Sequence, residues 1–479
     1  MRINPTIAKR ITTAVFGLVL VSASTACSTT DDVEAADTTT AATATAAEVV
    51  TADVAPADAA VGEASSIELF DSTAVHDIDI EFDQDDYDEM IATYEESSEK
   101  DWIEATITID GTVIEQVGLR LKGNSSLFGL TSDTAENPEE LPWLIRFDKF
   151  VDDQTYQEYG DIVIRSNSTE TSMNEAVALE LLGAAGLATQ EAISTRLTVN
   201  GGDTELRLAI EHPDEVWTEA NFDTSSGPLY KADSTGDYSY RGDDPDDYDE
   251  VFDQKAGDDD LEPLIDFLEF INNADDDEFA NGLEALLDID AFATYLAFQD
   301  LIGNFDDIDG PGNNSYLYFD DATGQFTVVS WDLNLAFDTS NVNGGGANGG
   351  GRGGPPVGVE IPEDFDPSQG LPDGSEPPLG GGGQGGGGGR GAGGGAGGGG
   401  GGGQLGGNVL AERFMDNALF AQMYDDATIE LTNSLYTSGT ATEIIDVWVD
   451  TLTAQADDIV DATTIQRDAD AIVSSIQNA

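Results

Sequence analysis

A run of almost pure glycine between Asp338 and Asn408 most constrains what this chain can fold into. The chain has 54 glycines among its 479 residues, and most of them lie in this run. Polyglycine has no side chains to pack and has the largest backbone entropy to lose on folding, so residues 339–407 are predicted to be a disordered insertion. The run does not have the spaced glycines of a phosphate-binding loop at a strand–helix junction. Any folded domain must therefore be assembled from the sequence on both sides of it.

The N-terminus has the pattern of a bacterial targeting segment. Three basic residues, Arg2, Lys9 and Arg10, precede an apolar run at 14–21 that is too short to span a bilayer as a permanent helix. The only cysteine, Cys27, comes after this run, at the position where a bacterial lipoprotein signal is cleaved and the cysteine is lipidated. We expect residues 1–26 to be a signal peptide and the protein to be lipid-anchored through Cys27, at the cell surface or in the periplasm. Ordinary secretion with a free cysteine is the alternative.

The charge balance excludes one class of partner. The chain has 94 Asp and Glu against 18 Lys and Arg, a formal net charge of -76, so it has no basic face for general nucleic-acid binding. Contact with a membrane is expected only through the N-terminal lipid. Residues 27–65, rich in Thr, Ala, Asp and Val, cannot bury enough apolar surface to order themselves and are predicted to be a disordered tether.

The remaining sequence predicts a mixed α+β fold that is rich in strands first and in helices later. Alternating polar and apolar residues predict strands at 77–82, 103–109, 117–121, 144–147, 161–165, 192–199 and 206–210. Helical spacing of apolar residues predicts helices at 172–182, 261–271, 279–287 and 290–301. The segment 237–260 is acidic and is predicted to be irregular. Residues 66–338 and 408–479 are expected to form the first part and the C-terminal helices of one domain.

Three polar residues stand out on a predicted loop–strand–turn–strand path. They are Asp306, Asn314 and Asp332. Asn314 and Asp332 each interrupt a run of aromatic and aliphatic residues, where a polar side chain is costly unless it has a partner. An Asp, an Asn and a second Asp arranged in this way are typical of phosphotransfer enzymes, which use them to position a hydroxyl and to hold divalent metal.

Six sequence blocks in this part of the chain resemble the spore-coat CotH kinase family. In chain order they are 120–126 (RLKGNSS), 143–148 (WLIRFD), 229–231 (LYK), 314–318 (NSYLY), 331–337 (WDLNLAF) and 410–424 (LAERFMDNALFAQMY). The resemblance extends from about Ile67 to the C-terminus, apart from the glycine-rich insertion. It implies a two-lobed atypical protein-kinase-like fold, with a strand-rich N-terminal lobe and a helical C-terminal lobe.

The resemblance also implies cofactors and roles. ATP and Mg²⁺, or Mn²⁺, are the implied cofactors, with Asp306 as the catalytic-loop Asp and Asn314 and Asp332 as metal ligands. The implied partner is an extracytoplasmic acceptor protein that is phosphorylated on Ser or Thr, and the enzyme is expected to be a monomer. Two alternatives remain open: the same fold could catalyse adenylylation or glutamylation of a protein, or the chain could be an inactive surface scaffold or calcium-binding module.

Positive charge is scarce, so the few clustered cations are candidates for binding phosphate. Five of them fall in one short strand-rich stretch: Arg120, Lys122, Arg146, Lys149 and Arg165. We expect Arg120, Lys122 and Arg146 of this stretch, together with Lys231, to bind phosphate, and the sequence does not decide whether Lys122, Arg146 or Lys231 acts as the kinase lysine. Glu180, on the helix predicted at 172–182, is a candidate ion-pair partner for that cation. Glu211, at the end of the strand predicted at 206–210, is a candidate for binding the adenine of ATP.

Overall fold

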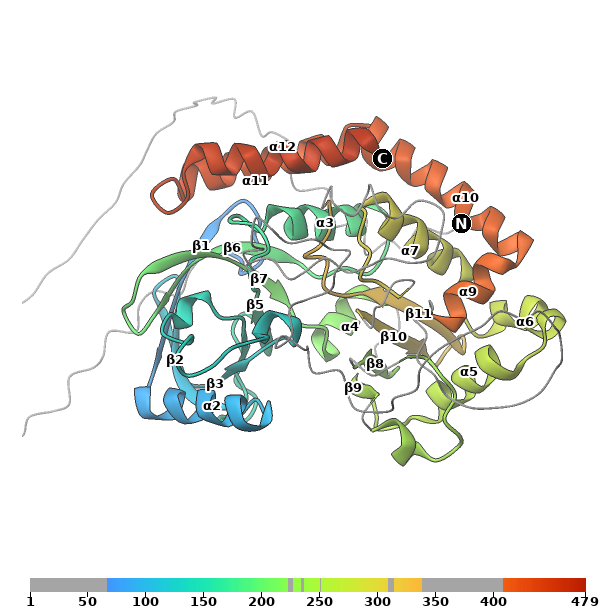
Figure 1. Cartoon of the computed structure of the whole chain (residues 1–479), viewed down its shortest axis with the longest axis horizontal. Helices are drawn as coiled ribbons and strands as arrows, with labels where there is room; N and C mark the ends of the chain where they lie inside the picture. The colour runs from blue at the N-terminus through green and yellow to red at the C-terminus, as the bar shows by residue number, and fades with distance from the viewer. Residues whose placement is uncertain (1–66, 223–226, 234–236, 250, 309–313, 338–407) are drawn as a thin grey trace, which may run out of the picture. The chain divides into compact units, whose positions relative to one another are not determined.

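The computed structural model describes residues 67–222, 227–233, 237–249, 251–308, 314–337 and 408–479 (Figure 1). The predicted signal peptide at 1–26, the predicted tether at 27–65 and the predicted insertion at 339–407 lie outside these residues. Within them the fold is mixed α+β, as predicted. No helix of the described part is long and apolar enough to cross a membrane.

The strand-rich first part forms a closed barrel in the order β1-β2-β3-β4-β5-β7-β6. Its strands are β1 (Val75–Phe82), β2 (Ile103–Ile109), β3 (Thr112–Leu121), β4 (Trp143–Arg146), β5 (Asp161–Ile164), β6 (Ala192–Val199) and β7 (Thr204–Glu211). Neighbours pair antiparallel except β1 and β6, whose parallel pairing closes the barrel. The sequence predicted all seven strands, two of them with the observed bounds, but it did not predict the closure.

Alternation along the strands decides what faces the barrel interior. Leu119 and Leu121 on β3 and Ile145 on β4 belong to the apolar cluster that fills the barrel. Because successive side chains of a strand point to opposite faces, Arg120 and Lys122 point outward. The outer face of the barrel therefore holds two of the predicted phosphate-binding cations.

A second sheet, in the order β11-β10-β8-β9, packs with the helices into a separate apolar cluster. Its strands are β8 (Leu229–Ala232), β9 (Phe252–Ala256), β10 (Ser315–Asp320) and β11 (Gln325–Ser330). β9 corrects the prediction that 237–260 is irregular. Only the two ends of this short strand, Phe252 and Ala256, are buried, and its polar centre concealed the strand pattern.

Helices surround these sheets. Those before the predicted insertion are α2 (Gln84–Ser97), α3 (Met173–Ala184), α4 (Glu215–Asn221), α5 (Glu262–Asn273), α6 (Asp276–Gly282) and α7 (Ile289–Leu301). Those after it are α9 (Val409–Asp416), α10 (Ala418–Leu431), α11 (Thr440–Gln455) and α12 (Ala462–Asn478). The helices predicted near α3, α5 and α7 are confirmed, whereas α2 was not predicted although Asp83 caps its N-terminus.

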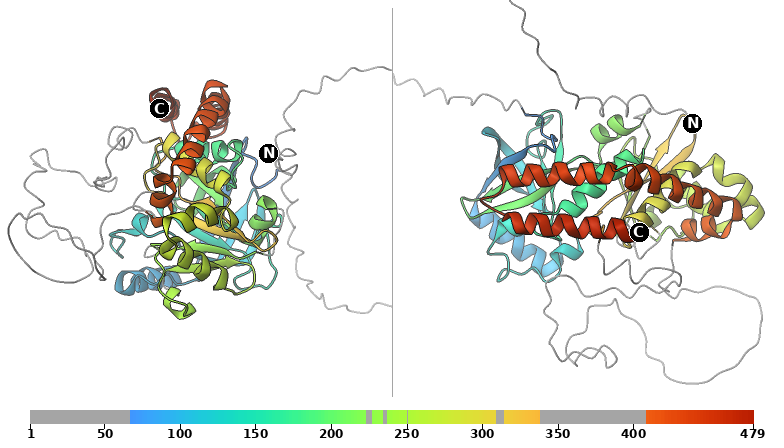
Figure 2. Two further views of the ribbon diagram at one scale, coloured as in Figure 1. Left: turned by 90° about the vertical axis from the view of Figure 1, so that its right-hand side faces the viewer. Right: turned by 90° about the horizontal axis from the view of Figure 1, so that it is seen from above.

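The C-terminal helices fold back onto the earlier part of the chain. α10 packs on α7, and α11 and α12 lie side by side against α3 (Figures 1 and 2). Side chains fix this contact: the indole of Trp448 on α11 donates to Glu180 on α3 at 2.7 Å, and Asp468 on α12 accepts from the hydroxyl of Thr171 at 2.8 Å. The described sequences before residue 338 and after residue 407 therefore belong to one compact unit.

Candidate functional site

The three predicted polar residues come together at one end of the β10–β11 hairpin. Asp306 lies in the loop after α7, Asn314 directly precedes β10, and Asp332 is the second residue after β11. The amide of Asn314 donates to both the backbone oxygen and the Oδ2 of Asp306, each at 2.9 Å. The backbone N–H of Trp331 donates to the carbonyl of Asn314 at 3.1 Å, which places Asp332 beside this pair.

The carboxylates of Asp306 and Asp332 repel each other at this position. Burial, and next the negative charge of Asp332, raise the pKa of Asp306 above its ordinary value, while the hydrogen bond from Asn314 acts in the opposite direction. Like charges that repel in a half-buried site are relieved by a cation between them. Asp306, Asn314 and Asp332 thus offer oxygen atoms at a place where positive charge is favourable.

A buried ion pair holds Asp332 in position. The guanidinium of Arg165, which follows β5, contacts Oδ1 of Asp332 and also Glu175 on α3, with a 2.9 Å separation between Arg165 Nη2 and Glu175 Oε1. Burial lowers the pKa of Arg165, but the charges of Asp332 and Glu175 outweigh this and leave it above its ordinary value. Asp332 itself has a φ of 60°, in the left-handed region that Asp tolerates better than most residues. The backbone turn and the ion pair together fix where its carboxylate lies.

Five cations gather opposite these carboxylates. Burial and the positive charges of Lys255, Arg120, Lys231 and Arg165 lower the pKa of Lys122 to about 7. Burial is also the main cause that lowers the pKa of Lys231 to about 8. Lys122 is thus shielded from water and surrounded by other cations, an arrangement that a polyanionic ligand would stabilise.

The two sheets bring the cations together from opposite sides. Arg120 and Lys122 lie on the outer face of the barrel. On the second sheet, Lys231 lies directly opposite Tyr316 of β10 and Asp253 of β9, so all three share one face. The ammonium of Lys122 lies 5.5 Å from the ring centroid of Trp331, next to Asp332 in the sequence. The candidate site therefore lies where the outer face of the barrel meets one face of the second sheet.

Two buried polar groups at this position lack a partner within the described residues. They are the Nε of Arg120 and the hydroxyl of Tyr316. Buried donors in folded proteins are almost always hydrogen-bonded, so an unpartnered pair indicates where a ligand supplies acceptors. Phosphate oxygens are suitable acceptors for both groups.

Three predicted residues have other partners. Arg146 forms a bidentate pair with Asp161, at 2.9 and 2.6 Å, on the edge of the cation cluster. The carboxylate of Glu211 accepts the backbone N–H of Glu191 at 2.8 Å. Glu180 accepts from Trp448, so the acid of α3 that pairs with a site cation is Glu175 instead.

A comparison with protein families supports the resemblance stated above. The family model for CotH kinase protein matches residues 119–467. The chain belongs to the CotH kinase family. The match covers most of the chain and includes the whole candidate site, from Arg120 on β3 to Asp332. No curated protein in a second comparison matches the chain.

Sequence reasoning did not predict three residues of this candidate site: Glu175, His212 and Lys255. Arg165, one of the clustered cations, directly follows the buried strand β5, and a charge in that position implies a buried partner. Lys255 lies two residues after Asp253 on β9, in the segment predicted to be irregular. Nothing in the sequence indicates that His212 contacts Lys122, because β3 and β7 are distant in the chain.

The residues of the candidate site fit a divalent cation. Among the described residues there is no cluster of three or more His, Cys, Asp and Glu that could hold a metal by itself. Mg²⁺ does not need such a cluster, because it is usually bound by one or two carboxylates, with substrate phosphates and water completing the octahedron. Asp332 offers the carboxylate and Asn314 an amide oxygen, since the amide nitrogen of Asn314 donates to Asp306.

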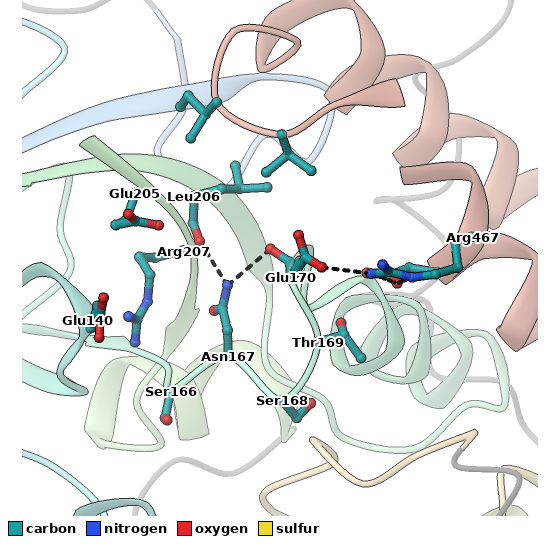
Figure 3. A pocket seen from close by; sticks show the side chains of 13 residues that line it. Glu140, Ser166, Asn167, Ser168, Thr169, Glu170, Glu205, Leu206, Arg207 and Arg467 are labelled. Atoms are coloured by element: carbon teal, nitrogen blue, oxygen red, sulfur yellow. Dashed lines mark hydrogen bonds and ion pairs between the residues drawn. The ribbon is translucent and has the colours of Figure 1, made fainter. Parts of the chain in front are cut away.

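A cavity of about 790 Å³ lies elsewhere in the described part of the chain (Figure 3). It is lined by the loop after β5 (166–170), by Glu205 and Arg207 of β7 and by Arg467 of α12. Its walls include none of the acids predicted from the sequence, and Arg207 is occupied by backbone carbonyls, such as that of Glu139 at 3.0 Å. The size of this cavity therefore does not identify the functional site; the converging charges do.

Proposed function

We propose that this chain is an extracytoplasmic, ATP-dependent, protein-kinase-like enzyme that transfers the γ-phosphoryl group to Ser or Thr of an acceptor protein. One observation carries the proposal: two carboxylates, Asp306 and Asp332, lie near Lys122, which has no carboxylate at ion-pair distance among the described residues and is surrounded by other cations. Membership of the CotH kinase family supports a kinase-like activity. The extracytoplasmic location and a lipid anchor at Cys27 are part of the proposal and rest on the sequence pattern of the N-terminus.

In this proposal, the cations bind the phosphates. Arg120 and Lys122 approach them from the barrel, and Lys231 and Lys255 approach from the second sheet. Phosphoryl transfer depends on positioning and on stabilising the charge of the transferred group, and fixed cations in a site shielded from water do both. The unpartnered Arg120 Nε and Tyr316 hydroxyl would donate hydrogen bonds to the same oxygens.

Asp306, Asn314 and Asp332 have separate roles in this proposal. Asp332 and Asn314 would hold Mg²⁺ or Mn²⁺, which when bound supplies further neutralisation of the β- and γ-phosphates. Asp306 would orient the acceptor hydroxyl and accept its proton, helped by its raised pKa and by the hydrogen bonds from Asn314. Arg165 and Glu175 contact neither substrate; they hold Asp332 in place. The barrel and the second sheet with its helices would correspond to the two lobes of a kinase.

Intact-mass spectrometry tests the proposal. The full chain is incubated with ATP and Mg²⁺ or Mn²⁺ beside Asp332→Ala, with Asp152→Ala in the exposed loop after β4 as the matched control. A phosphate-sized gain in the wild type and in Asp152→Ala, but not in Asp332→Ala, is the expected result. An adenylate-sized gain would redirect the proposal to adenylylation. No gain, together with no stabilisation of the fold by Mg-ATP, would leave the scaffold function.

A further inference from the structure

We propose that His212 positions the ammonium of Lys122 for phosphate binding, and that Asp161 enables it to do so by holding the imidazole as the Nδ1–H tautomer. This inference rests on the proposed function in one respect, that Lys122 binds phosphate. It assigns a role to two residues that the sequence did not single out for the site.

A continuous chain of contacts links four side chains of the barrel. The Nζ of Lys122, after β3, lies 3.3 Å from Nε2 of His212, which follows β7. The Nδ1 of the same imidazole lies 3.1 Å from Oδ2 of Asp161, the first residue of β5. Asp161 also receives two hydrogen bonds from Arg146. His212 and Asp161 are buried, so water does not compete for these contacts.

The chemistry of the partners fixes the tautomer. The pKa of Asp161 is lowered to about 2: burial raises it, but the hydrogen bonds from Arg146 and His212 outweigh burial. A carboxylate can only accept, so Nδ1 of His212 must carry the proton. Burial, and next the charge of Lys122, lower the pKa of His212 to about 4, so the ring is neutral near pH 7. Its Nε2 therefore has a free lone pair that accepts an N–H of Lys122.

A neutral acceptor suits a phosphate-binding lysine better than a carboxylate does. Within the described residues, no carboxylate lies at ion-pair distance from Lys122, whereas Lys255 is paired with Asp253 at 2.5 Å and Arg165 with Glu175. A carboxylate on Lys122 would cancel the charge that a phosphate needs, while an imidazole directs one N–H and leaves two for the ligand. The negative charge of Asp161, on the far side of the imidazole from Lys122, is already compensated by Arg146.

The same arrangement ties Lys122 to the acidic side of the site. The imidazole of His212 meets the ring of Trp331 edge to face, with 6.2 Å between centroids, and Lys122 lies 5.5 Å from the same ring. Trp331 directly precedes Asp332. Moving His212 would therefore change the distance between the phosphate-binding lysine and the proposed metal ligand.

The tautomer is tested first, on the full chain without nucleotide. The chain contains only two histidines, so a long-range ¹H–¹⁵N spectrum of ¹⁵N-histidine-labelled protein has two imidazole signals, and His212→Gln assigns them. We expect a neutral ring protonated at Nδ1 for His212 at pH 7. A ring protonated at Nε2, or a doubly protonated ring, would overturn the inference. His76, whose Nδ1 lies 2.7 Å from Asp110, gives the reference signal.

Binding is tested next, with inorganic tripolyphosphate and with Mg-ATP in separate calorimetric titrations. His212→Ala should bind tripolyphosphate about tenfold more weakly than wild type, the size expected for one charge-assisted hydrogen bond. His212→Gln should restore most of the affinity, because its side-chain carbonyl can accept from Lys122, and the matched control His76→Ala should have no effect. Equal affinity of His212→Ala and wild type would refute the positioning role.

The two ligands separate this inference from the proposed function. If the wild type binds tripolyphosphate but not Mg-ATP, the kinase proposal fails while the effect of His212→Ala still decides the inference. If the wild type binds neither ligand, both fail. If the wild type binds both ligands, and His212→Ala lowers the affinity whereas His76→Ala does not, the proposed function and the positioning role of His212 are both supported.

Discussion

Replacing Arg165 by Met tests the buried ion pair on which the position of Asp332 depends. The Arg165 side chain is 9% exposed and that of Glu175 only 2%, so Met would leave the carboxylate of Glu175 buried without its counter-ion. Breaking a buried pair on one side costs about 3–5 kcal/mol of unfolding free energy. Asp332 adds less to this loss, because its side chain is 26% exposed and can be hydrated.

A double-mutant cycle measures the pair itself. Glu175→Gln in the Arg165→Met background removes the stranded charge, so the double variant should recover about 2 kcal/mol relative to the sum of the single changes. Urea denaturation followed by tryptophan fluorescence gives the four free energies. The control is Arg196→Met: this residue forms a more exposed pair with Asp458, with 2.7 Å between Nη1 and Oδ1, and its loss should cost about 1 kcal/mol or less.

The outcome that refutes the reasoning is specific. If Arg165→Met costs no more than Arg196→Met, or if the coupling with Glu175 is near zero, Glu175 is not a buried charge that depends on Arg165. The account of how Asp332 is held would then be wrong, whatever the enzyme does.

Three further predictions concern ligand binding. The affinity for Mg-ATP should fall as the pH rises through about 7 and about 8, because Lys122 and Lys231 lose their charge there. In calorimetry across this range, the affinity of Lys122→Arg should depend less on pH than that of the wild type, because arginine keeps its charge. Glu180→Gln should leave nucleotide affinity unchanged, whereas Glu175→Gln should weaken it, because only Glu175 contacts Arg165. Chelating the divalent metal should abolish thermal stabilisation by ATP in a melting experiment, and stabilisation that persists would contradict the proposed role of Asp332.

Local patterns predicted well what local structure determines. The strand β2 has the predicted bounds because its alternation is regular, and β6 has them because Ile193, Leu197 and Val199 on one of its faces are buried in the barrel. Asp332 and Asn314 are close together because β10 and β11 are joined by a short turn, so their pairing follows from neighbouring sequence. The sequence motif and the hairpin therefore predicted that Asn314 and Asp332 lie near each other in the candidate site.

Contacts between residues far apart in the chain could not be predicted from local sequence patterns. Barrel closure depends on the parallel pairing of β1 with β6, and the contact of Arg165 with Asp332 joins residues 167 positions apart. The wrong acid was favoured on α3 because this helix is buried on almost all sides and has little apolar periodicity, so nothing distinguished Glu175 from Glu180. The polar strand β9 was missed because its charged side chains face the site and break the apolar pattern.

The central claim is that Asp332 and the opposing cations form a binding site for a metal–nucleotide complex. Titrating the full chain with ATP in a calorimeter, with and without Mg²⁺, tests this most directly, beside Asp332→Ala and the control Asp152→Ala. We predict Mg²⁺-dependent binding in the wild type and in Asp152→Ala that is lost in Asp332→Ala. Absence of binding in the wild type, or equal binding by Asp332→Ala, would contradict the claim.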